Sequence, residues 1–175
     1  MKRGLALFLV AAFLPACGSD DGDDETAADT TRPPAERAVF ESSRLGFTFE
    51  YPADLAVDRT PRQPVLARVA VKRRARLNSI QVRQTARREL HPTRYLDEFR
   101  RDLERSVERV ETREDRIGAL DVGVLEVEGR GFTSSSYFFA GAGRTWQLEC
   151  LSDDEHRARI DEACRIALGT IAFVD

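Results

Sequence analysis

Three segments of alternating apolar and polar residues follow one another in the second half of the chain, with a glycine motif between each pair. The segments cover residues 122–128, 132–139 and 145–150, and the motifs are Gly129-Arg130-Gly131 and Gly141-Ala142-Gly143. Alternation with a period of two is typical of strands that bury one face. Because glycine tolerates positive φ, a Gly-x-Gly motif between such strands favours a tight hairpin. Neither motif precedes a helix, which argues against a dinucleotide-binding loop.

Further strands are predicted earlier in the chain. Residues 47–51 alternate strictly and end at Pro52, and residues 38–41 can pair with them across a short turn. The alternation returns over residues 65–72 and, briefly, at Ile80 and Val82.

An apolar stripe with helical spacing separates these strands from the later hairpins. Its members are spaced by 3, 4, 4 and 3 residues, which is one face of an amphipathic helix; they are Leu96, Phe99, Leu103, Val107 and Val110. Pro92-Thr93 suits the first turn of a helix. We therefore expect one helix that runs from this point through Val110.

A second helix is expected over about residues 153–168. The sequence Ser152-Asp153-Asp154-Glu155 fits a capping box at its start, and Gly169 is placed to end it. Its buried stripe consists of Ile160, Ala163, Cys164, Ala167, Leu168 and Ile171. A last short strand is expected over residues 170–174.

The order of these elements predicts the fold class. Strands, a helix, a run of hairpin strands and a C-terminal helix indicate an α+β domain, in which an antiparallel β-sheet is flanked by helices.

Two segments of the domain resemble a known family. The sequence Leu45-Gly46-Phe47-Thr48-Phe49-Glu50-Tyr51-Pro52 is similar to the G-F-x-F-x-Y-P opening of PsbP-like domains, and residues 145–150 and 160–173 resemble the strand, helix and strand that end them. The layout of the whole chain resembles LpqN-type actinobacterial lipoproteins. The resemblance covers about residues 40–174. It implies an α/β/α sandwich and a partner-binding or accessory module, and it implies no catalytic residues.

The N-terminus has the pattern of an export signal. Lys2 and Arg3 precede an apolar run over residues 5–14, which is about half the length needed to cross a bilayer. Leu14-Pro15-Ala16-Cys17 follows and resembles a lipobox, although Pro15 departs from the usual residue at its position. The resemblance implies cleavage before Cys17, acylation of Cys17, and attachment to the extracytoplasmic side of a membrane. The alternative is an ordinary secretory signal with a chance cysteine.

The chain is predicted to have three parts. Residues 1–16 form the signal peptide. Residues 17–36 contain the lipidated cysteine and an acidic tether, which has seven acidic residues against Arg32 and no aromatic or large aliphatic residue, a composition typical of disorder. Residues 37–175 form the globular domain.

The chain has three cysteines. If the lipid occupies Cys17, then Cys150 and Cys164 remain as a pair in an oxidising compartment. Their spacing is not that of a CxxC redox motif, and Cys164 belongs to an apolar helix face, which favours a structural disulfide over a redox pair.

A search for catalytic and metal-binding patterns finds little. The only histidines are His91 and His156, and neither lies near cysteines or carboxylates with ligand spacing. Ser134-Ser135-Ser136 lies in a strand pattern without a G-x-S-x-G elbow. The sequence therefore predicts no metal, no cofactor and no enzyme. The alternative is a small envelope hydrolase that uses Ser/His chemistry or the carboxylates at residues 153–155.

One charge asymmetry stands out from the rest of the composition. Residues 62–101 hold twelve basic residues against three acidic ones, whereas residues 102–175 have a net charge of −7. The candidate binding residues in this basic stretch are Lys72, Arg73, Arg74, Arg76, Arg83, Arg87 and Arg88. They predict a face for anionic lipid, an acidic envelope polymer or an acidic protein partner. The alternative is a solvated surface in an arginine-rich protein. Nucleic acid is an improbable ligand for an exported chain.

Overall fold

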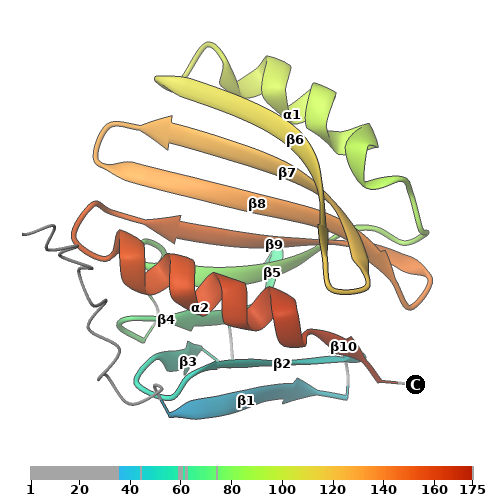
Figure 1. The fold of residues 1–175 in the computed structure, drawn as a ribbon, viewed down its shortest axis with the longest axis vertical. Coiled ribbons are helices and arrows are strands. Elements are labelled where there is room, and N and C mark those ends of the chain that lie inside the picture. Colours follow the sequence, from blue (N-terminus) through green and yellow to red (C-terminus); the bar gives the residue numbers. More distant parts are fainter. Residues whose placement is uncertain (1–35, 44, 59–60, 62, 74, 175) are drawn as a thin grey trace, which may run out of the picture. The chain divides into compact units, whose positions relative to one another are not determined.

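The computed structural model describes residues 36–43, 45–58, 61, 63–73 and 75–174 (Figure 1). The predicted signal peptide, Cys17 and all of the tether except Glu36 lie outside these residues, as does Arg74. The elements in chain order are β1 (Arg37–Ser42), β2 (Phe47–Pro52), β3 (Ala56–Asp58), β4 (Val65–Ala70), β5 (Ser79–Ala86), η1 (Pro92–Tyr95), α1 (Leu96–Leu103), β6 (Arg109–Ile117), β7 (Leu120–Gly129), β8 (Phe132–Gly141), β9 (Arg144–Ser152), α2 (Arg157–Thr170) and β10 (Ala172–Phe173).

The strands form two antiparallel sheets. The larger sheet has the order β3-β4-β5-β9-β8-β7-β6, and the smaller one has the order β1-β2-β10. The expected α+β fold with an antiparallel sheet and flanking helices is confirmed. Both Gly-x-Gly motifs lie at hairpin turns, where Gly131, Ala142 and Gly143 have positive φ.

The two helices cover opposite faces of the larger sheet. Helix α2 packs on β9 and β5 and also on β2 of the smaller sheet, whereas α1 packs on β6 and β7 (Figure 1). Successive residues of β8 show the two faces directly. Phe139 belongs to the main core under α2, and Phe138 belongs to a second apolar cluster with Leu96 and Leu125. Both rings are fully buried, because each face of this strand has its own cover.

The first predicted helix is shorter than its apolar stripe. Helix α1 ends at Leu103, and Val110 lies in strand β6, which the sequence did not predict. Strand β6 pairs with β7 over its whole length, through a turn in which Gly118 has positive φ. Val107 and Val110 still contact the same apolar cluster as the helix. The helical spacing therefore predicted correctly that Val107 and Val110 pack against the same cluster, but it predicted wrongly that they belong to the helix.

The second predicted helix also begins and ends at different residues. The buried stripe from Ile160 to Leu168 is confirmed. The capping box is wrong, because Ser152 ends strand β9 and α2 begins only at Arg157, so that Asp153 lies outside the helix. Its carboxylate accepts hydrogen bonds from the side chain of Asn78 at 2.7 Å and from the backbone N–H of His156 at 2.9 Å. The prediction that Gly169 ends the helix is wrong as well, since α2 continues to Thr170.

No helix in the described part of the chain is long and apolar enough to cross a membrane.

Candidate functional site

The predicted basic residues fall into separate groups in the structure. Lys72, Arg73 and Arg76 are exposed on the connection between β4 and β5, which we call the basic hairpin; Arg74 belongs to it in sequence but lies outside the described residues. Arg87 and Arg88 are exposed just after the other end of β5. At ~3.3 Å per residue, the length of this strand separates the two groups by roughly 25 Å. They do not form one continuous patch.

Arg83 belongs to neither exposed group. It lies within β5, where its Nη2 donates to Glu149 Oε2 at 2.7 Å and to Gln81 Oε1 at 3.2 Å. The side chain is partly buried, at 27% exposure. Arg83 is therefore part of the sheet surface, and its charge is partly compensated there.

A row of polar side chains crosses the larger sheet on the face that carries Arg83. Strand pairing aligns the row from β3 to β8, and its members are Asp58, Arg68, Gln81, Glu149 and Ser136. Asp58, Arg68, Gln81 and Ser136 are all buried. The next position in this row is the apolar Leu125 of β7, where the cover of α1 begins. The polar row thus occupies the part of this face that lies beyond α1.

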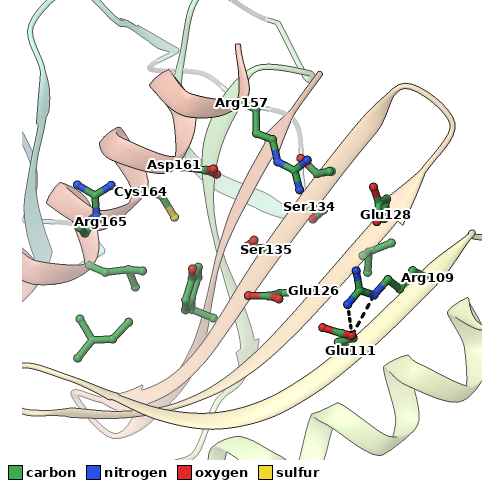
Figure 2. A pocket seen from close by; sticks show the side chains of 15 residues that line it. Arg109, Glu111, Glu126, Glu128, Ser134, Ser135, Arg157, Asp161, Cys164 and Arg165 are labelled. Atoms are coloured by element: carbon green, nitrogen blue, oxygen red, sulfur yellow. Dashed lines mark hydrogen bonds and ion pairs between the residues drawn. The ribbon is translucent and has the colours of Figure 1, made fainter. Parts of the chain in front are cut away.

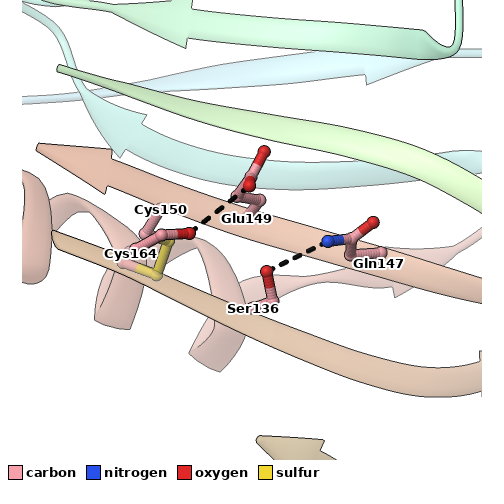
Figure 3. Close-up of a disulfide and its surroundings, with 6 residues drawn as sticks. Ser136, Gln147, Glu149, Cys150 and Cys164 are labelled. Atoms are coloured by element: carbon pink, nitrogen blue, oxygen red, sulfur yellow. Dashed lines mark hydrogen bonds between the residues drawn. A yellow bond between two sulfur atoms is a disulfide. The ribbon is translucent and has the colours of Figure 1, made fainter. Parts of the chain in front are cut away.

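Hydrogen bonds link the members of the row and their neighbours. Arg68 Nη1 pairs with Asp58 Oδ2 at 3.4 Å, and Ser134 Oγ donates to Glu149 Oε1 at 3.3 Å. Gln147 Nε2 donates to Ser136 Oγ at 3.0 Å (Figure 3). Burial of polar groups costs free energy unless they are hydrogen-bonded, and these bonds offset part of that cost.

A concavity of about 680 Å³ opens over one end of this row. We call it the open-face concavity. Its lining is mainly polar and charged, and consists of Asp58, Gln63, Pro64, Val65, Arg68, Arg76, Gln81, Arg83, Glu149 and Leu151. Ligand pockets are commonly of this size, and two of the predicted binding residues, Arg76 and Arg83, line it together with Arg68 from the same basic stretch.

A second hollow, of about 430 Å³, lies between α2 and the hairpins of β6, β7 and β8. Figure 2 shows side chains of both charges around it, with Arg157, Asp161 and Arg165 on α2 and Arg109 and Glu111 on β6. Arg109 forms an ion pair with Glu111. The pKa of Tyr137, on the floor of this hollow, is raised because the side chain is buried and because Glu126 is near. The charges of this hollow largely compensate one another.

The disulfide expected from the cysteine count is present in the structure. It joins Cys150 on β9 to Cys164 on α2, with 6.1 Å between their Cα atoms (Figure 3). Because residues alternate along β9, Cys150 faces α2, while Glu149 belongs to the open-face concavity on the opposite side. The bond attaches α2 to the sheet directly behind that concavity.

The residues considered for hydrolase chemistry are engaged elsewhere. His91 Nδ1 lies 2.8 Å from Thr93 Oγ1, and His156 Nδ1 lies 2.9 Å from Asp153 Oδ1. In the described part of the chain no serine hydroxyl is hydrogen-bonded to a histidine. The pKa of Asp153 is lowered to about 2, first by the hydrogen bond from Asn78 and then by that from His156. A carboxyl group with so low a pKa is a poor proton donor near neutral pH.

Potential metal ligands do not cluster in the residues that the structure describes. They contain no group of three or more histidine, cysteine, aspartate or glutamate side chains able to hold an ion.

Sequence reasoning missed the polar row. Arg68 and Glu149 each interrupt an apolar strand, since Arg68 lies between Ala67 and Val69, and Glu149 lies between Leu148 and Cys150. Alternation places each residue on the opposite face of its strand from its buried neighbours. That signal could not show that they share a row, because the row depends on the register between strands that are distant in sequence.

Comparison with known proteins identifies the fold. No protein-family model matches the chain, and no curated protein does. The solution structure of cyanobacterial PsbP (CyanoP) from Synechocystis sp. PCC 6803 is similar, with a TM-score of 0.53, 10% identity, and coverage of 83% of this chain and 97% of that one. The crystal structure of LpqN, involved in cell envelope biogenesis of Mycobacterium tuberculosis, gives a TM-score of 0.49 at 8% identity, covering 82% of this chain and 87% of that one. The chain has a PsbP-like fold, and at this identity the likeness extends to the fold alone.

Proposed function

We propose that this protein is an exported lipoprotein whose PsbP-like domain serves as a non-enzymatic binding or accessory module on the extracytoplasmic side of a membrane. The observation that carries the proposal is the segment Leu14-Pro15-Ala16-Cys17 directly after a short apolar run. Lipid chains on Cys17 contribute about 0.8 kcal/mol per buried methylene, so two or more chains give stable anchoring. The disulfide between Cys150 and Cys164 fits an oxidising compartment.

The domain surface supports binding better than catalysis. The basic hairpin presents several cations to solvent, and the open-face concavity gathers arginines and carboxylates. The hydrolase alternative would need a serine, or a pair of carboxyl groups, beside a proton-transferring group. Ser134 does donate to a carboxylate, that of Glu149, but this carboxylate is already paired with Arg83 at 2.7 Å, and Ser136 accepts from Gln147.

Replacing Cys17 by Ala is expected to abolish membrane anchoring. Without the thiol there is no site for the thioether, so the variant should accumulate as an unlipidated precursor. Labelling with a fatty acid and partition between detergent and aqueous phases measure the effect. Ser19→Ala is the matched control and should remain lipidated. If the Cys17→Ala protein still partitions fully into the detergent phase after removal of its signal segment, the lipoprotein proposal is wrong.

The basic hairpin is expected to attract acidic surfaces. In a chain that starts at Gly18, and therefore lacks the lipid, Lys72→Glu/Arg73→Glu/Arg76→Glu should lose most of its binding to anionic vesicles at low salt. Exposed charges are screened over about 10 Å at 0.1 M salt and about 3 Å at 1 M, so the binding of the unmodified protein should also fall with salt. Vesicle co-sedimentation with anionic and neutral lipid measures both effects.

The control for this experiment reverses three other exposed arginines, Arg105, Arg116 and Arg130. It makes the same change in net charge away from the basic hairpin. If both triple variants bind equally well, or if the unmodified protein does not prefer anionic vesicles, the hairpin has no role at lipid surfaces. The same pair of variants, tested for binding to an acidic wall polymer, examines a second of the expected ligands.

A further inference from the structure

Arg68 is a buried cation with few partners. It is 7% exposed, and its hydrogen bond to Asp58 is long, at 3.4 Å. Its Nε is buried and has no hydrogen-bond partner. A guanidinium carries several N–H donors, and a buried donor without an acceptor destabilises the fold. The site therefore holds a buried cation with at least one donor that the described residues leave without an acceptor.

Arg83 repeats this pattern on the neighbouring strand. Its Nη2 reaches Glu149 and Gln81, and its Nε is also buried without a partner. Arg68 and Arg83 both line the open-face concavity, where the exposed Arg76 joins them from the basic hairpin. Donors from three elements of the fold thus meet around one hollow.

The charges around the hollow do not cancel. Among the described residues that line it, three arginines face two carboxylates, Asp58 and Glu149, which is an excess of one positive charge. A buried ion pair is often no more stabilising than apolar residues of similar volume, so stability alone gives little reason to place a charged row in a sheet. A single negative charge with oxygen acceptors would neutralise the excess and supply the missing acceptors.

We propose that the open-face concavity is a binding site for a singly charged oxyanion group, such as a phosphodiester or a carboxylate, held by Arg68, Arg83 and Arg76. The guanidinium fork matches the spacing of two oxygens in either group. Val65, Pro64 and Leu151 border the same hollow and give the remainder of the ligand an apolar surface to contact. The inference rests on the proposed role as a binding module and does not depend on the lipid anchor.

The test is calorimetric titration of the purified full chain in a neutral detergent. The probes are glycerophosphoglycerol and gluconate, which are a phosphodiester and a carboxylate that both carry hydroxyl groups, with sorbitol as the uncharged control. At least one anion should bind saturably and sorbitol should not. Phosphatidylglycerol nanodiscs form a second arm, which distinguishes a free anion from the same diester in a lipid headgroup.

Two variants should move the affinity in opposite directions. Arg83→Gln removes a donor and should weaken binding roughly tenfold, the usual effect of one charge-assisted hydrogen bond. Glu149→Gln removes the carboxylate that competes for Arg83 and should strengthen binding. Arg130→Gln is the matched control, because it makes the same charge change at a fully solvated side chain on the β7–β8 turn. Near-ultraviolet circular dichroism checks that each variant keeps its tertiary packing.

The proposal is overturned if neither anion nor the nanodisc binds saturably, or if Arg83→Gln binds as tightly as Arg130→Gln. Loss of anchoring in the Cys17 experiment would leave this result unaffected, so failure of the anchor and failure of the site are distinguishable.

Discussion

Replacing Trp146 by Ala is expected to lower the free energy of unfolding by about 3–5 kcal/mol, the usual range for removing a large aromatic side chain from a core. Trp146 is 1% exposed. It lies on β9 of the larger sheet, and its ring meets Phe47 edge-on at 5.2 Å and lies 6.2 Å from Phe173, two residues of the smaller sheet. Its Nε1 donates to the Gly141 carbonyl at 2.9 Å. Trp146 is therefore part of the main core.

Chemical denaturation followed by far-ultraviolet circular dichroism measures this loss, because Trp146 is the only tryptophan and fluorescence would disappear with it. Trp146→Phe keeps an aromatic ring and should cost much less. Val39→Ala, at a side chain that is 61% exposed, should stay within about 0.5 kcal/mol. An alanine variant as stable as the Val39 control would show that the two sheets are not joined through this ring.

Removing the disulfide is expected to lower the free energy of unfolding by about 3 kcal/mol, the chain-entropy value for a loop of this size. Cys150 and Cys164 are 14 residues apart in sequence, and both are buried. The bond restricts the unfolded chain and holds α2 on β9. The variant Cys150→Ala/Cys164→Ala avoids the unpaired thiol that a single substitution would leave.

Reductant provides the matched comparison for this prediction. It should destabilise the unmodified protein by a similar amount and leave the double variant unchanged. Intact-mass analysis after alkylation counts the free thiols of the folded protein. Two thiols that react in the folded protein without reductant would contradict the disulfide, and equal stability with and without reductant would contradict its contribution.

Several features of the fold could be predicted because they depend on neighbouring residues. The hairpins of β7, β8 and β9 follow from local alternation and from glycines at their turns. The buried stripe of α2 follows from helical spacing, and the segment around Phe47 and Phe49 led to the correct fold resemblance. In each case the burial pattern repeats within a short stretch of chain, so no knowledge of distant contacts was needed.

Other features were decided by contacts between distant segments. The helical spacing of apolar residues continues to Val110. The backbone of Val110 nevertheless pairs with Val127 as β6 aligns with β7, and a longer helix would have prevented this pairing. The sequence offers a capping box over Ser152-Asp153-Asp154-Glu155, yet Ser152 ends strand β9 and Asn78, from the turn before β5, holds Asp153 outside the helix.

The open-face concavity shows the division most clearly. The sequence by itself determined that Arg68, Arg83 and Glu149 belong to the polar phase of three strands, because side chains alternate along a strand. Only the tertiary structure decided that these strands are neighbours, in a register that aligns Arg68, Gln81 and Glu149 in one row. The physical reason is that the register between strands is set by the packing of their buried faces and by turns elsewhere in the chain. The alignment of the polar residues on the other face follows from that register and cannot be read from the polar residues themselves.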